Sequence, residues 1–168
     1  MTRVLLVGLM AAGKSIVSQA ISAASGWPAL DNDVLLERST GLTAVQLLET
    51  RGPHALRSAE SDVLTLTLSM PGPLVAGVPA GVVLDEGDRM RLSAGGHVVY
   101  LRTPVSLLVR RVSGRDHRPF LDGDVTGALR AMSEQRDPLY VEVAHQVLEM
   151  QFLTPVQAAR QVLAALRD

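Results

Sequence analysis

The octapeptide GLMAAGKS, residues 8–15, constrains the fold of this chain more than any other feature. It fits the pattern G-x-x-x-x-G-K-[ST], and it stands between the apolar run RVLLV and the helical pattern KSIVSQAISAA. Gly8 and Gly13 permit a tight loop whose backbone N–H groups turn inward around an anion. The helix that follows adds its positive N-terminal end to the same point. The sequence therefore predicts a buried strand, a phosphate-binding loop and a helix in succession.

Lys14 is the only lysine of the chain, and every other basic side chain is arginine or histidine. A compact ammonium group on a flexible stem can follow a phosphoryl group, whereas a planar guanidinium fits a curved loop poorly. Ser15 offers a hydroxyl to Mg²⁺. We expect MgATP as the ligand, bound by Gly8, Ala11, Ala12, Gly13, Lys14, Ser15 and Ile16. The alternative is a glycine-containing turn that binds nothing.

Buried strands alternate with helical patterns along the whole chain. The strands are expected at 3–8, at the segment ending in 31–33, and at 73–78, 97–102 and 146–150. Helical patterns cover 14–24, 33–39, 43–51, 55–68, 86–93, 104–112 and 154–168, with Thr154 as an N-cap and Pro155 as the first helical residue. This order predicts an α/β fold, a three-layer sandwich with a five-stranded parallel sheet and helices on both faces, built as one domain over residues 1–168.

Composition narrows the class of protein. The chain has 168 residues, a net charge of -1 and no cysteine, which excludes a disulfide framework, a thiolate nucleophile and Cys-ligated zinc. The near-neutral charge argues against a nucleic-acid partner. No apolar run is long enough to cross a membrane, and the first residues lack a signal-peptide pattern. We expect a cytoplasmic monomer that acts on a small molecule.

Two acidic residues, Asp31 and Asp33, follow the second expected strand in the tripeptide DND. In a doubly wound sheet this strand end lies near the phosphate-binding loop, where one carboxylate can hold the Mg²⁺ shell and the other an acceptor hydroxyl. Taken alone, DND is also typical of a turn with a helix N-cap.

The segments GLMAAGKS, LDNDVLLERSTG, LRSAESDVL, DHRPFL and RDPLY occur in the order and spacing of the shikimate kinases. The chain resembles this family over nearly its whole length. The resemblance implies a P-loop kinase that phosphorylates the 3-hydroxyl of shikimate with MgATP, in the biosynthesis of chorismate and aromatic amino acids. It also implies that residues 34–70 form the acceptor-binding region and residues 112–124 the lid.

The resemblance assigns roles to individual residues. Asp31 matches the aspartate of the metal shell and Asp33 the one that binds the acceptor hydroxyl. Arg57 and Arg136 match two arginines that hold the substrate carboxylate, a role suited to guanidinium forks. The alternative for Arg57 is a pair with Glu60, three residues on, along a solvated helix.

Two arginines of the expected lid region match family positions. Arg118 matches the lid arginine that reaches the transferred phosphoryl, and Arg111 matches the arginine near adenine. Either could instead be a solvated surface arginine. His117 is expected to be a surface residue and not a base.

Three departures from the family pattern concern the surroundings of these residues. PAG (79–81) replaces a run of three glycines, which leaves Gly81 as the expected substrate contact and puts the shape of the acceptor pocket in doubt. Ile16 replaces a hydroxyl that can help to hold the α-phosphate. The stretch EMQFLTP lacks an arginine that the family often places against adenine.

Three hypotheses for the function follow. The first is a shikimate kinase. The second is a catalytically weak relative that binds nucleotide or a partner in a regulatory or structural role. The third is a kinase of another carboxylated cyclitol or polyol, because the altered glycine run borders the pocket.

Overall fold

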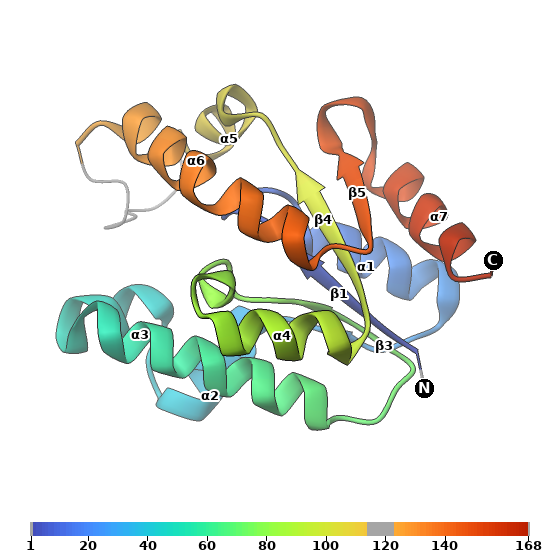
Figure 1. The fold of residues 1–168 in the computed structure, drawn as a ribbon, viewed down its shortest axis with the longest axis horizontal. Helices are drawn as coiled ribbons and strands as arrows, with labels where there is room; N and C mark the ends of the chain where they lie inside the picture. Colours follow the sequence, from blue (N-terminus) through green and yellow to red (C-terminus); the bar gives the residue numbers. More distant parts are fainter. Residues whose placement is uncertain (1, 114–122, 168) are drawn as a thin grey trace.

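A computed structural model describes residues 2–113 and 123–167. Its centre is a five-stranded sheet in which every pairing is parallel (Figure 1). The strand order is β2-β3-β1-β4-β5. The strands are β1 (Arg3–Val7), β2 (Ala29–Leu30), β3 (Leu74–Gly77), β4 (His97–Arg102) and β5 (Gln146–Glu149). The predicted α/β fold with five parallel strands is confirmed.

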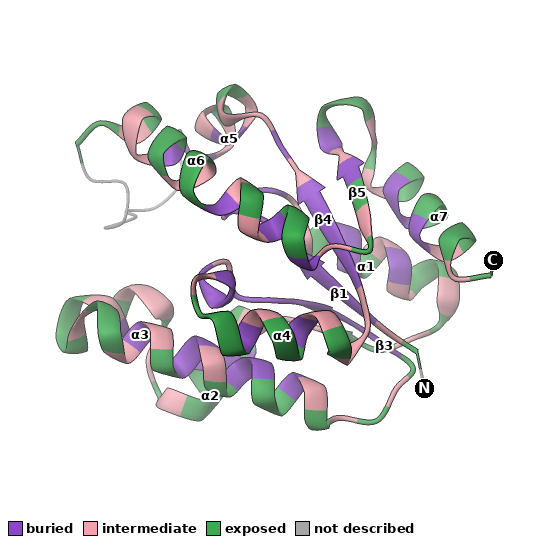
Figure 2. Ribbon diagram, in the orientation of Figure 1, coloured by how far each residue is buried: buried purple, intermediate pink, exposed green. Residues whose placement is uncertain are grey.

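The central strands are buried on both faces, as their apolar sequences predict. In β1, Leu5 pairs with Ala76 of β3 on one side and with Val98 of β4 on the other. All three side chains are fully buried. Figure 2 shows this buried strip running through the middle of the molecule. The sheet thus gives a rigid base to the loops at its C-terminal edge.

Helices cover both faces of the sheet. On one face α1 packs against α7, and on the other α4 lies beside α6 (Figure 1). A pair formed by α2 and α3 stands at the β2 side. The helices are α1 (Lys14–Ser25), α2 (Asn32–Thr40), α3 (Ala44–Ser69), α4 (Glu86–Gly95), α5 (Val105–Val112), α6 (Val125–Val143) and α7 (Pro155–Ala165), with 3-10 turns η1 (Val82–Leu84) and η3 (Met150–Phe152).

One expected break is confirmed and one helix was missed. The label α3 spans two helical segments that are divided at Gly52, whose φ of 83° and ψ of 177° are not helical, as the separate patterns at 43–51 and 55–68 predict. The 19-residue helix α6 was not predicted at all, because Gly127 and Pro138 interrupt its pattern. Thr154 caps α7 as expected.

The helices α2 and α3 share a small apolar core of their own. It is separate from the large core around the sheet, and its buried members are Leu35, Leu36, Leu47, Leu56, Ala59 and Val63. This cluster holds α2 and α3 together as one wall beside the sheet edge. None of the helices in the described ranges has the length and apolar character that crossing a membrane demands.

Candidate active site

The loop between β1 and α1 has the glycine geometry that its sequence predicts. Gly8 and Gly13 have positive φ angles of 152° and 102°. A β-carbon on Gly8 would lie 3.1 Å from the carbonyl oxygen of Leu101, so the loop also passes close to β4. Both positions therefore favour glycine on conformational grounds, and at Gly8 there is also little space for a side chain.

The N-terminus of α1 is suited to bind an anion. Gly13 is its N-cap, no side chain caps its first N–H groups, and its first turn holds no acidic residue. The free N–H groups and the helix dipole thus favour a negative ligand at this point.

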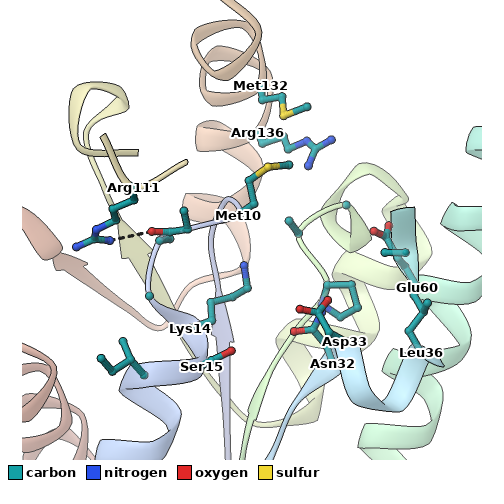
Figure 3. A pocket seen from close by; sticks show the side chains of 18 of the residues that line it. Met10, Lys14, Ser15, Asn32, Asp33, Leu36, Glu60, Arg111, Met132 and Arg136 are labelled. Carbon is teal, nitrogen blue, oxygen red and sulfur yellow. Dashed lines mark hydrogen bonds between the residues drawn. The ribbon is translucent and has the colours of Figure 1, made fainter. Parts of the chain in front are cut away.

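Arg111 is hydrogen-bonded to the loop. Its Nη1 donates to the carbonyl oxygen of Ala11, a residue with φ of 64°, at 2.8 Å (Figure 3).

Lys14 is the first residue of α1, and its ammonium group lies inside the loop. Nζ donates to the carbonyl oxygens of Gly8 at 2.7 Å and Leu9 at 3.2 Å. Burial lowers the pKa of Lys14 to about 8, and the nearby carboxylate of Asp33 opposes this shift. The lysine is therefore a poorly solvated cation that gains from a neighbouring phosphate.

Ser15 and Asp31 bring a hydroxyl and a carboxylate together beside the loop. Ser15 Oγ donates to Asp31 Oδ2 at 3.2 Å. Asp31 Oδ1 caps α2, accepting from the backbone N–H of Asp33 at 2.8 Å. Asp31 thus forms the helix N-cap, as one interpretation of DND predicts, and it also meets Ser15 beside the loop; its place in a metal shell stays a prediction. Two oxygen ligands fit Mg²⁺, which keeps several waters and binds phosphate oxygens; within 2–113 and 123–167, no three acidic or histidine side chains gather into a larger metal site.

A cavity of about 690 Å³ runs from this loop to the wall formed by α2 and α3 (Figure 3). Its lining includes most of the residues that the sequence singles out. They are Ala11, Ala12, Gly13, Lys14, Ser15, Ile16, Asp33, Arg57, Gly81, Arg111 and Arg136. Gly8 and Asp31 do not line it but hold lining residues in place through the contacts above.

Arg57 lines the cavity from α3 and pairs with Glu60 on the next turn. The pair is not on a solvated helix face, because Glu60 is only 8% exposed and burial raises its pKa. A β-carbon on Gly81 would overlap the Arg57 guanidinium and lie 2.5 Å from Glu60 Oε2. Arg57 therefore makes the predicted pair and still faces the cavity.

Arg136 projects from α6 toward the same cavity (Figure 3). It is 5% exposed, and its Nε makes no hydrogen bond to any described residue. A buried guanidinium nitrogen rarely lacks an acceptor, because burying an unsatisfied donor on a charged group is costly. This arrangement favours an anionic ligand at Arg136.

The segment PAG at 79–81 adopts ordinary backbone geometry. Among the described residues other than glycine, only Ala11 has a positive φ, so Ala80 needs no glycine. The Pro79 carbonyl accepts from Val82 N at 3.2 Å as the chain enters η1. Within this segment only Gly81 lacks room for a side chain. The substituted glycines therefore cause no backbone strain, and their effect on the shape of the acceptor pocket stays a prediction.

The opposite end of the cavity is more apolar. Ile16, Met150, Leu153 and Pro155 line it together with Arg111. Arg118 and His117 lie outside the described residues, as does most of the expected lid at 112–124.

Sequence reasoning missed several residues of this site. Glu60 was considered only as a surface partner of Arg57, yet it lines the cavity. Asn32 lines it beside Asp33 and donates to Asp33 Oδ1 at 3.3 Å. Met10 and Met132 give it apolar surface, but an isolated methionine carries no signal that could have identified it.

Comparison with known proteins places this geometry in a family. The family model described as shikimate kinase matches residues 10–167. The chain belongs to the shikimate kinase family. It is 35% identical over 167 residues to the shikimate kinase of Halorhodospira halophila, covering 99% of this chain and 94% of that protein. The shikimate kinase of Acinetobacter baylyi is 37% identical over 159 residues, covering 94% of this chain and 88% of that protein.

The fold of this shikimate kinase family member agrees with solved structures. Shikimate kinase from Acinetobacter baumannii, solved in complex with shikimate, has a TM-score of 0.93 and 33% identity, covering 99% of this chain and 93% of that chain. A sugar kinase from Janibacter, at 14% identity, has a TM-score of 0.68 and shares the fold alone. The chain is accordingly an ATP-dependent phosphotransferase.

Proposed function

We propose that this protein transfers the γ-phosphoryl group of MgATP to the 3-hydroxyl of shikimate. The observation that carries the proposal is the buried Arg136, whose Nε is unpartnered and which shares one cavity with Lys14 and its phosphate-binding loop. An acceptor that carries a carboxylate pairs with Arg136 at one end and presents a hydroxyl to the nucleotide at the other. Family membership supports shikimate as that acceptor.

The loop binds the triphosphate in this proposal. Backbone N–H groups of residues 8–15 and Lys14 surround the β- and γ-phosphates, and Ser15 and Asp31 hold Mg²⁺ directly or through water. The apolar end of the cavity, with Ile16, Leu153 and Arg111, receives the base. Mg²⁺ supplies charge neutralisation on the phosphate oxygens.

Asp33 and the arginines act on the acceptor. Arg57 and Arg136 hold the carboxylate, and Asp33 accepts the proton of the attacking hydroxyl. The acceptor oxygen forms its bond to the γ-phosphorus while the bond from that phosphorus to the β-bridging oxygen breaks, and ADP leaves. Lys14 stabilises the negative charge on the phosphoryl oxygens, and Arg118 is proposed to do the same from the lid.

Several broader expectations remain part of this proposal. The chain acts as a cytoplasmic monomer of one domain, with residues 34–70 as the acceptor-binding region and 112–124 as the lid. The small apolar core of α2 and α3 supports such a semi-independent acceptor wall. Neither a nucleic acid nor a membrane takes part.

A coupled assay that follows ADP release with shikimate and MgATP tests the function. We expect saturable turnover that depends on both substrates, and phosphate on the 3-hydroxyl of the product by NMR. Asp33→Ala is the control that removes the proton acceptor and should lower kcat by at least about a hundredfold. Calorimetric binding of both ligands without turnover would instead favour the weakly active relative. A better acceptor among other carboxylated polyols would favour the third hypothesis.

A further inference from the structure

Tyr140 connects two walls of the cavity, although it does not line the cavity itself. Its side chain is 1% exposed, and its hydroxyl donates to the carbonyl oxygen of Ala80 at 2.7 Å. Ala80 is the middle residue of the segment 79–81, which lines the acceptor end of the cavity. A short hydrogen bond from a buried tyrosine hydroxyl to this partly buried carbonyl restrains the position of that backbone segment.

The same tyrosine lies beside Arg136. The two residues are four positions apart on α6 and so share one face of the helix. Burial raises the pKa of Tyr140 to about 12, and the positive charge of Arg136 opposes that shift. The hydroxyl therefore keeps its proton at neutral pH and remains a donor.

A movement of the segment 79–81 would also displace the guanidinium of Arg57. Gly81 has no space for a β-carbon because the guanidinium of Arg57 lies against it. Tyr140 thus shares one face of α6 with Arg136 and reaches Arg57 through Ala80 and Gly81. Both arginines belong to the carboxylate clamp proposed above.

We propose that Tyr140 is a positioning residue that sets the spacing between Arg136 and the segment 79–81, and through it the affinity for the acceptor carboxylate. The inference rests on the proposed function. The resemblance implies glycines at two positions where this chain has Pro79 and Ala80. The hydrogen bond from Tyr140 holds the carbonyl group of one of these two residues, Ala80.

The other tyrosine of the chain provides a matched control. Tyr100 is 4% exposed, and its ring centroid lies 4.9 Å from that of Tyr140. Its hydroxyl donates to Asp137 Oδ1 at 2.8 Å, and among the described residues it makes no hydrogen bond to Arg136 or to the segment 79–81. Tyr140→Phe and Tyr100→Phe each remove one buried hydroxyl from the same aromatic pair, so a general loss of stability affects both.

Steady-state kinetics of the two variants test the proposal. We expect Tyr140→Phe to raise the KM for shikimate about five- to tenfold with the KM for ATP unchanged, as for the loss of one hydrogen bond. Tyr100→Phe should leave both KM values within about twofold of the wild type. A similar shikimate KM in the two variants, or a parallel rise of the ATP KM in Tyr140→Phe, would overturn the inference.

A neutral ester of shikimate removes the charge of the carboxylate and keeps the ring and hydroxyl groups of the acceptor. Wild type and Tyr140→Phe should bind the ester equally weakly, and a tyrosine effect that persists on the ester would contradict the inference. Calorimetric titration with shikimate, run at low temperature if Tyr140→Phe is unstable, measures this binding without phosphoryl transfer. Failure of the wild type to bind or phosphorylate shikimate refutes the proposed function; normal wild-type activity with unaltered binding by Tyr140→Phe refutes only the role of Tyr140.

Discussion

Gly81 and the guanidinium of Arg57 are in such close contact that no β-carbon fits between them. Arg57 also pairs with Glu60, which is buried and lines the same cavity. The glycine is therefore required by the position of an arginine side chain and not by its own backbone angles, since its φ is -86°. One of the two expected carboxylate-binding arginines thus occupies space that a glycine in a different segment of the chain leaves open.

Gly81→Ala should displace Arg57 and weaken acceptor binding. We expect the KM for shikimate to rise at least about tenfold, which corresponds to losing one charge-assisted hydrogen bond, with little change in the KM for ATP. The neighbouring substitution Ala80→Gly, which adds no atom, should have a smaller effect. Equal effects of the two substitutions in the kinetic assay would show that the contact with Arg57 is unimportant.

The pKa of Lys14 predicts a proton linkage in nucleotide binding. In the free protein burial lowers this pKa to about 8, and a bound triphosphate raises it again by favouring the charged ammonium. ATP binding should therefore take up protons, with little uptake well below pH 8 and most of the uptake between about pH 8 and the raised pKa of the complex. The affinity for ATP should fall as the pH rises through that interval. Calorimetry in two buffers of different ionisation enthalpy measures the uptake.

Lys14→Arg is the control for this linkage. A guanidinium stays charged across the whole range, so the variant should show none of the proton uptake near pH 8 even where its affinity is lower. Unchanged uptake in the variant would mean that another group titrates. Lys14 also links the pH to the stability of the free wild-type protein. Between about pH 8 and 10.5 the unfolded chain binds more protons than the folded chain, so the free energy of unfolding increases as the pH rises through that interval.

Ala11 is held in the left-handed region at φ of 64°, which is unfavourable for a residue with a β-carbon. Ala11→Gly should remove this cost, less the extra entropy of glycine in the unfolded chain, and increase the free energy of unfolding by about 0.5–1 kcal/mol. Urea denaturation of the free protein measures the change. Ala12→Gly is the matched control: Ala12 is buried with an ordinary φ, so that substitution should be destabilising.

The pair of Ser15 and Asp31 predicts a specific metal dependence. Ser15→Ala removes one of two expected oxygen ligands and should raise the Mg²⁺ concentration needed for half-maximal activity about tenfold, while saturating Mg²⁺ restores part of the rate. Titration of activity with Mg²⁺ at fixed ATP measures it. An unaltered Mg²⁺ curve for Ser15→Ala, alongside an unaltered curve for Asp31→Asn, would remove both residues from the metal shell.

The parts of this fold that local patterns define were predictable from the sequence. The glycine spacing of residues 8–15 and the apolar strands specify the loop, the sheet and the start of α1. The helix α6 was missed because Gly127 and Pro138 weaken its local signal, while packing of Leu129, Tyr140 and Val143 into the core stabilises it. Tertiary contacts overrode local propensity there.

The candidate site was predictable only where residue type carries the chemistry. Lys14 was identified from the loop pattern and Asp33 from its place after the second strand, whereas the family resemblance supplied Arg57 and Arg136. All four line one cavity. The contact of Gly81 with Arg57 and the hydrogen bond from Tyr140 to Ala80 join segments far apart in sequence, which no local pattern reveals. Neither Pro79 nor Ala80 has a positive φ, so the backbone accepts both residues without strain, while their effect on the shape of the acceptor pocket stays a prediction.

A crystal structure of the protein with shikimate and MgADP tests the central claim most directly. The account predicts the shikimate carboxylate within hydrogen-bond distance of the Arg57 and Arg136 guanidinium groups. It also predicts the 3-hydroxyl near Asp33 and directed toward the position of the transferred phosphoryl. A carboxylate bound elsewhere, or a different hydroxyl facing the nucleotide, would contradict it.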